Sequence, residues 1–101
     1  MTIWKERRWT TTENRAIEII VWYHKSDDFD DRKFYAVSVY PVTIEGGMIT
    51  AECYAGYKHF LFEVSRKTKK SDNAAIDMVR RHLIDEMLEK VCTKHNLKLE
   101  Y

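Results

Sequence analysis

The run SRKTKKSDNAA, residues 65–75, could bind an anion, because it places four cations just before the predicted start of a long helix. These cations are Arg66, Lys67, Lys69 and Lys70. The first turn of a helix presents unpaired N–H groups and about half a positive charge, so its N–H groups and the nearby cations can converge on one phosphate. The alternative is a solvated basic turn, in which Ser71 caps the helix and Asp72 relieves the repulsion.

In this part of the chain, a predicted strand is followed by a basic turn and then by a helix. The helix opens with paired lysines and with Ala74 and Ala75. This arrangement resembles the carboxy-terminal half of double-stranded-RNA-binding domains, over residues 58–85. The resemblance implies that cations at the start of the last helix meet phosphates across a groove. The first helix of that family has no counterpart in this chain, and its further lysine falls near Asn73. Duplex nucleic acid is therefore the alternative partner.

An acidic segment, SDDFDDR at residues 26–32, surrounds Phe29 with Asp27, Asp28, Asp30 and Asp31. A calcium loop of the EF-hand type needs ligands at alternating positions, a central glycine and a bidentate glutamate, and this segment lacks them. Asp28, Phe29 and Asp30 either dock on a basic partner or belong to a solvated loop. In a symmetric dimer, this segment could meet SRKTKK across the two-fold axis.

Metal and catalytic chemistry find little support in the spacing of the residues. Cys92 and His95 have i, i+3 spacing, and Cys53 or His59 could approach from a sheet, but structural zinc sites bring two closely spaced ligand pairs. The chain has no glycine-rich phosphate loop and no nucleophile elbow. We therefore predict a non-catalytic protein with no cofactor, metal or small-molecule substrate. A small nuclease with dispersed histidine and lysine residues is the open alternative.

Large aromatic side chains with a polar edge are numerous for so short a chain. They are Trp4, Trp9, Trp22, Tyr23, Tyr35, Tyr40, Tyr54 and Tyr57. A single helix covers one face of a sheet, whereas the predicted strands are apolar on both faces. The second face is either covered by the amino-terminal segment or buried by a partner. We predict that Trp4, Trp9 and Tyr57 anchor a protein–protein interface.

An antiparallel sheet must position these residues. Four segments rich in β-branched and aromatic residues predict its strands, at 15–24, 34–45, 48–55 and 58–65. Short connections between them predict a meander. Residues 3–9 could add an edge strand, and the glycines at 46–47 predict a hairpin turn.

From Ser71 the hydrophobic period changes from two to about 3.6 residues, which predicts one helix of about 24 residues. Its predicted core stripe is Ile76, Val79, Leu83, Met87 and Val91, flanked by Ile84 and Leu88. Asn96 can adopt the left-handed cap, and residues 97–101 alternate like a short strand. The predicted fold class is α+β: an antiparallel meander of four to five strands, one long C-terminal helix packed across one face, and a short terminal strand.

Length and composition limit the class of protein. The chain has 101 residues, of which 45% are hydrophobic and 13% aromatic, so residues 1–101 should form a single folded domain. A net charge of +1 gives no overall attraction to nucleic acid or membrane. The lack of a long apolar run and the presence of only two cysteines predict a cytoplasmic protein. We predict that the protein acts through a protein–protein interface, as an adaptor, inhibitor or immunity-type protein. The partner in this interface could also be a second copy of the chain, in a homodimer.

Overall fold

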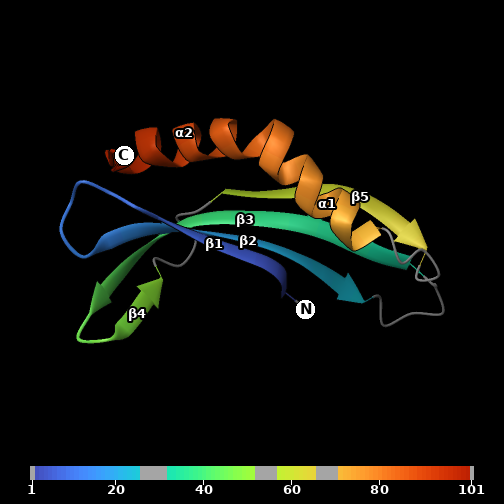
Figure 1. Cartoon of the computed structure of the whole chain (residues 1–101), viewed down its shortest axis with the longest axis horizontal. Coiled ribbons are helices and arrows are strands. Elements are labelled where there is room, and N and C mark those ends of the chain that lie inside the picture. The colour runs from blue at the N-terminus through green and yellow to red at the C-terminus, as the bar shows by residue number, and fades with distance from the viewer. Residues whose placement is uncertain (1, 26–31, 52–56, 66–70, 101) are drawn as a thin grey trace.

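The computed structural model describes residues 2–25, 32–51, 57–65 and 71–100, without the side chains of 24–25, 32–34, 57–65 and 71. In these ranges the chain forms an antiparallel sheet and one helical run that packs against it (Figure 1). The predicted α+β class is therefore confirmed. Among the described residues, no helix is both long enough and apolar enough to cross a membrane.

The sheet has the strand order β1-β2-β3-β4, and β5 also pairs with β3. The strands are β1 (Thr2–Trp9), β2 (Arg15–Lys25), β3 (Arg32–Glu45), β4 (Met48–Ala51) and β5 (Tyr57–Ser65). β2 and β3 carry many β-branched and aromatic residues, whose side chains pack well on a pleated surface. β1 pairs with β2 in antiparallel register, so the predicted edge strand at residues 3–9 is confirmed.

β4 and β5 occupy successive stretches of the same edge of β3. β2 takes the other edge along nearly the whole of β3, while β5 lies beside residues 32–39 and β4 beside residues 42–45. Both strands run antiparallel to β3 and therefore in the same direction as each other. The predicted meander reversed the chain near Gly56 and placed residues 58–65 beside 48–55, and this detail is wrong. β3 is long enough to pair with two shorter strands in turn.

Local chemistry sets two turns at one end of the sheet. Gly46 and Gly47 have φ angles of 56° and 80°, which the tight hairpin turn between β3 and β4 requires. Between β1 and β2, the buried Thr10 hydroxyl donates a hydrogen bond to the Arg15 carbonyl over 2.9 Å and accepts one from the Thr12 N–H at 3.2 Å. The hydroxyl therefore supplies hydrogen-bond partners to two backbone groups inside this turn.

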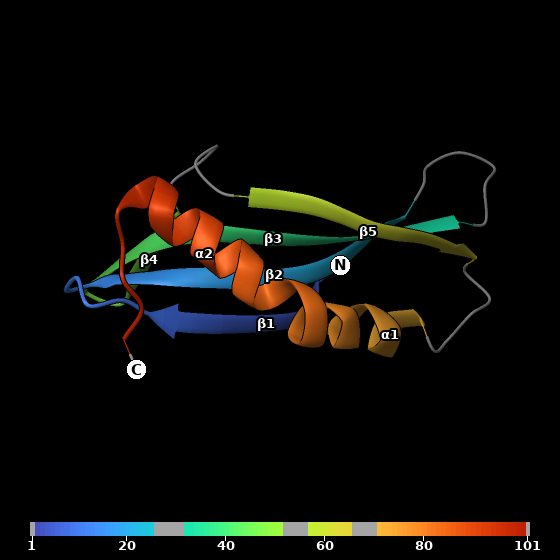
Figure 2. The same ribbon diagram turned by 90° about the horizontal axis from the view of Figure 1, so that it is seen from above.

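The helical run crosses one face of the sheet (Figures 1 and 2). It consists of α1 (Ser71–Met78), η1 (Val79–Leu83) and α2 (Ile84–His95). η1 is π-helical, so its turn holds one residue more than an α-helical turn. Ile84 therefore follows Val79 into the core, whereas Leu83 is only partly buried. Ala75, rather than the predicted Ile76, is fully buried one turn before Val79.

The hydrophobic core lies between the helical run and the sheet. Its members are Ile17, Ile19, Val21, Tyr35, Val37, Val39, Ala75, Val79, Ile84, Met87, Leu88 and Val91. The Tyr35 hydroxyl donates a hydrogen bond to the Asp72 carboxylate. Asp72 lies in the first turn of α1, so this bond ties the start of the helix to the centre of the sheet.

The end of the helical run is capped as the sequence predicts. Asn96 adopts the left-handed conformation with φ of 52°, and its N–H reaches the carbonyls of Cys92 and Thr93. The chain then returns to the sheet, where Leu99 forms an isolated antiparallel bridge with Thr10. The predicted terminal strand is therefore reduced to this single bridge at the end of β1.

Candidate functional site

The sheet face opposite the helical run is the candidate site, and we call it the helix-free face. Successive residues of a strand point to opposite faces, so the alternation that puts Ile17, Ile19 and Val21 in the core turns their neighbours to this face. Its large side chains, assigned from the strand register, are Arg7, Trp9, Glu18, Ile20, Trp22, Tyr40, Ile44 and Ile49.

An ion pair with a buried carboxylate and a half-buried arginine lies in the middle of the helix-free face. Glu18 on β2 is the cross-strand partner of Arg7 on β1. Arg7 donates two hydrogen bonds to Glu18 Oε1, from Nη2 at 2.6 Å and from Nε at 2.9 Å. Glu18 is only 1% exposed, and its Oε2 is buried without a hydrogen-bond partner among the described residues. Desolvation of this carboxylate is unfavourable, and the arginine offsets it.

Tyr40 on β3 lies on the other side of Glu18, so Arg7, Glu18 and Tyr40 form one row across three strands. Burial raises the pKa of the Tyr40 phenol above its usual value of 10.0, and the negative charge of Glu18 raises this pKa further. The half-buried phenol is therefore protonated at neutral pH, and its hydroxyl can donate a hydrogen bond.

Trp9 ends β1 and is 47% exposed. The Arg7 guanidinium carbon lies 5.9 Å from the centroid of the Trp9 ring, within the range of a cation–π contact. Arg7 therefore contacts both the Glu18 carboxylate and the Trp9 ring. An exposed aromatic side chain that is already held in place loses little conformational entropy when a partner covers it.

Trp22 lies towards the other end of the helix-free face and is half-buried. Its indole Nε1–H donates a hydrogen bond to Ser38 Oγ on β3 over 3.3 Å. Ile20, also half-buried, lies between Trp22 and Glu18 along β2. Tryptophan side chains whose polar N–H is satisfied can present the rest of the ring to an apolar partner.

The β3–β4 hairpin extends the apolar part of this face. Ile44 and Ile49 are cross-strand partners, and Ile49 is 47% exposed. Met48, next to the turn, is 71% exposed. Figure 1 shows that the hairpin bends away from the helical run. Large apolar side chains are therefore exposed at the Trp9 end of the sheet and on the hairpin.

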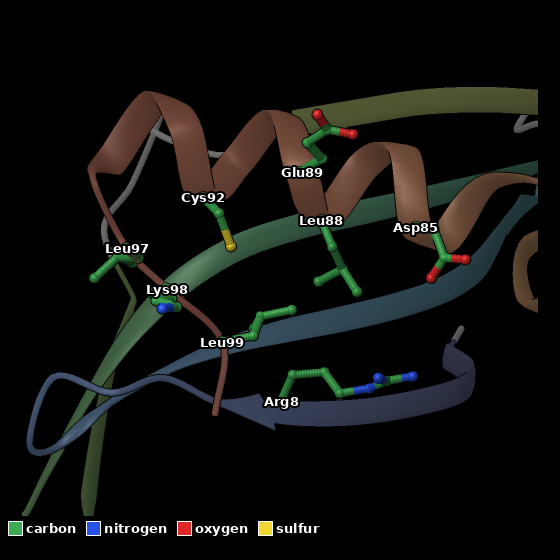
Figure 3. A pocket seen from close by; sticks show the side chains of 8 residues that line it. All are labelled: Arg8, Asp85, Leu88, Glu89, Cys92, Leu97, Lys98 and Leu99. Atoms are coloured by element: carbon green, nitrogen blue, oxygen red, sulfur yellow. The ribbon is translucent and has the colours of Figure 1, made fainter. Parts of the chain in front are cut away.

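A groove lies on the opposite side of the sheet, between α2, the C-terminal segment and β1 (Figure 3). Its volume is about 620 Å³. It is lined by the apolar residues Leu88, Cys92, Leu97 and Leu99 and by the charged residues Arg8, Asp85, Glu89 and Lys98. Burial raises the pKa of the Cys92 thiol above its usual value of 9.0. The thiol is therefore protonated at neutral pH and is a weak nucleophile.

The predicted anchors are separated by the structure. Trp9 lies on the helix-free face, whereas Trp4 packs against the core on the helix side. These two residues are an odd number of positions apart in β1, so they point to opposite faces. Tyr57 begins β5, but its side chain lies outside the described residues, as does the whole acidic segment with Asp28, Phe29 and Asp30.

The predicted phosphate-binding residues cannot be assembled into a site. Arg66, Lys67, Lys69 and Lys70 lie outside the described residues. Asn73 is exposed in the first turn of α1, beside Asp72. Nucleic-acid binding therefore stays a prediction.

The row formed by Arg7, Glu18 and Tyr40 is the feature that sequence reasoning missed. One signal was present, because Glu18 is the sole charged residue of the apolar run from Ala16 to Trp22. An acid in such a run indicates a partner on a neighbouring strand, but the strand register is needed to identify it.

Within the described part of the chain, no group of three or more histidine, cysteine, aspartate or glutamate side chains could hold a metal ion. Comparisons of the chain with family models, with curated proteins and with solved structures found no match. The functional argument therefore depends on the geometry of the helix-free face.

Proposed function

We propose that this chain is a protein-binding module that uses the helix-free face as its interface. One observation carries the proposal: this face keeps exposed and half-buried aromatic and aliphatic side chains around an ion pair that is neutralised within the face. The centres of protein interfaces are enriched in tryptophan, tyrosine and arginine and depleted in lysine, aspartate and glutamate. Trp9, Trp22, Tyr40 and Arg7 match that composition.

The ion pair supports binding because it needs no new counter-charge from the partner. Glu18 is already desolvated and already paired with Arg7, so covering this face adds little desolvation cost for the carboxylate. Among the described side chains of this face, Lys5 is the remaining charged group, and it is exposed near the edge of the sheet. The apolar partner surface would therefore meet rings and aliphatic side chains, with the Tyr40 hydroxyl as a polar contact.

The partner is either a second copy of the chain or a different protein, as for an adaptor, inhibitor or immunity-type protein. Sedimentation velocity over about 1–100 μM protein separates the two, because a dimer through this face would dissociate on dilution. Truncation of a tryptophan that anchors an interface costs about 2 kcal/mol or more, which is about a thirtyfold loss of affinity. Trp9→Ser should therefore abolish self-association in this range, or capture of a partner.

The matched control is Lys94→Ser, which changes an exposed residue of α2 on the other side of the molecule. Immobilised wild type, Trp9→Ser and Lys94→Ser are each exposed to extract of the source cells. We expect at least one protein that wild type and Lys94→Ser retain and Trp9→Ser loses. The proposal is wrong if all three variants are monomeric and retain the same proteins.

A further inference from the structure

The outer edge of β1 has backbone groups that face away from β2, and the C-terminal segment shows which ones. Glu100 N–H donates to the Trp9 carbonyl over 2.9 Å, and Thr11 N–H donates to the Lys98 carbonyl over 2.8 Å. Thr10 N–H instead donates inward, to Arg15 on the β2 side. Trp9 and Thr11 therefore turn their backbone groups to the outer edge, and Thr10 turns its groups to β2.

Alternation along the strand extends this assignment to the middle of β1. The N–H and C=O groups of Arg7 and Lys5 must face outward, as those of Trp9 do. Among the described residues, no backbone group of a turn or of the C-terminal segment forms a hydrogen bond with the backbone of Arg7 or Lys5 at this outer edge. Figure 2 shows this edge as one border of the sheet, with α1 near its start and the C-terminal segment crossing near its end. Within the part of the chain that the structure describes, one short stretch of strand edge between them has no backbone partner.

The groove between α2 and β1 borders this stretch on the helix side (Figure 3). Leu88, Leu99 and Cys92 supply apolar surface, and Arg8 extends along β1 towards Asp85. A strand added to the edge of β1 would turn every second side chain to this groove. The groove has four apolar and four charged lining residues, so these side chains should be apolar where they lie against Leu88, Cys92 and Leu99.

The remaining side chains of an added strand would lie on the helix-free side, opposite Lys5 and Arg7. Lys5 is exposed and has no ion-pair partner among the described side chains, whereas Arg7 already binds Glu18. A second copy of β1 is a poor occupant, because antiparallel registers centred on these residues set cation against cation. Acidic residues at these positions would instead be attracted. The charge of the edge therefore selects against self-pairing and for an acidic strand.

We infer that the outer edge of β1 binds an extended segment of another protein in which acidic residues alternate with apolar ones. The acidic residues lie opposite Lys5 and Arg7 and exchange backbone hydrogen bonds with them, and the apolar residues enter the groove beside Leu99. This mode of recognition adds a strand to a sheet edge, where the main chain supplies affinity and alternate side chains supply selectivity. The site adjoins the helix-free face, because Lys5 and Arg7 belong to both, but its backbone hydrogen bonds and its groove lie outside that face.

The probe is the peptide acetyl-Asp-Val-Asp-Leu-Asp-Val-Asp-amide, titrated into the ¹⁵N-labelled full chain. We expect slower hydrogen exchange at the amides of Lys5 and Arg7, and an affinity that weakens as salt is added. The same peptide with lysine in place of aspartate should not bind. Lys5→Pro removes the outward N–H while leaving the β2 side unaffected, and we expect it to weaken binding about tenfold, compared with a smaller effect of Lys5→Ala.

A change in the peptide tests the same hydrogen bonds without altering the protein. The aspartates of the added strand turn their N–H groups to β1, and the apolar residues turn theirs away. N-methylation of the central aspartates should therefore abolish protection at Lys5 and Arg7, whereas N-methylation of the valines should leave it largely intact. Equal binding of the acidic and basic peptides, or unchanged exchange at both amides with millimolar peptide, would overturn the inference.

Discussion

Replacing Arg7 with methionine would leave the Glu18 carboxylate buried without its counter-charge. Methionine keeps most of the apolar stem of arginine, so the change removes the charge and hydrogen bonds with little loss of packing. The Glu18 side chain is 2% exposed and that of Arg7 is 32% exposed. Because Arg7 is partly hydrated, we expect a loss of about 2–4 kcal/mol in the free energy of unfolding, rather than the roughly 3–5 kcal/mol of a fully buried pair.

The adjacent residue provides a matched control. Arg8 Nε lies 3.2 Å from Glu6 Oε2, but their side chains are 40% and 33% exposed. Arg8→Met removes an arginine from the same strand, yet it should cost clearly less than Arg7→Met, about 1 kcal/mol, because both side chains of this pair are partly exposed whereas Glu18 is not. Both variants are compared with wild type by urea unfolding followed by far-ultraviolet circular dichroism, a signal that does not depend on Trp9.

The double variant Arg7→Met/Glu18→Gln separates the charge from the loss of contact. Glutamine has nearly the shape of glutamate and no charge, so the double variant should recover at least half of the loss caused by Arg7→Met alone. Thermal unfolding gives a second measurement, since each kcal/mol shifts the melting temperature by about 4–8 °C in a domain of this size. Equal losses for Arg7→Met and Arg8→Met, or a double variant no more stable than Arg7→Met, would refute the reasoning.

Met87→Ala should cost about 2–5 kcal/mol as a core truncation, and Leu83→Ala clearly less, because the π-helical turn leaves Leu83 only partly buried; equal losses would contradict the assigned core stripe. Since burial and a nearby carboxylate raise the Tyr40 pKa above 10.0, its contribution to stability should be complete below pH 10 and be lost as the pH rises through its folded-state pKa. Tyr40→Phe should flatten this alkaline loss in urea unfolding at pH 9–12, and an unchanged profile would argue against the shift. If the basic segment binds duplex RNA or DNA, changing Lys69 and Lys70 to Glu should abolish binding and its salt dependence in fluorescence anisotropy, whereas equal binding of the variant would remove this alternative.

The periodicity of the sequence predicts the ends of the helical run correctly, but not the burial of every residue within it. The change of period at Ser71 and the cap at Asn96 locate both ends of the helical run, because both depend on local sequence. The periodic pattern predicts that Leu83 lies in the core stripe and that Ile84 flanks it. In the structure Ile84 is buried and Leu83 is only partly buried. A stripe with constant period assumes α-helical turns, and one π-helical turn rotates every later side chain relative to the earlier ones.

Some features of the candidate site could likewise be predicted from the sequence, and others could not. The exposure of Trp9 could be predicted from the sequence, because aromatic side chains exceed what one helix can cover, whereas its role as an anchor stays a prediction. Alternation along one strand places Trp4 and Trp9 on opposite faces of the sheet, so this pattern already argues against both residues anchoring one interface. The pairing of Glu18 with Arg7 and Tyr40 required the registers of two strand pairs, which one residue of slip would change completely.

The α+β class, the strand segments, the GG hairpin and the ends of the helix can be read from the local sequence, because they follow from period, turn chemistry and capping within a few residues. Three other features appear only in the folded chain: β5 pairs with β3, Asp72 bonds to Tyr35, and a groove lies between α2 and β1. Each of these joins segments far apart in the chain. Their contacts depend on how several strands and the helix pack at once, and no local pattern specifies that arrangement.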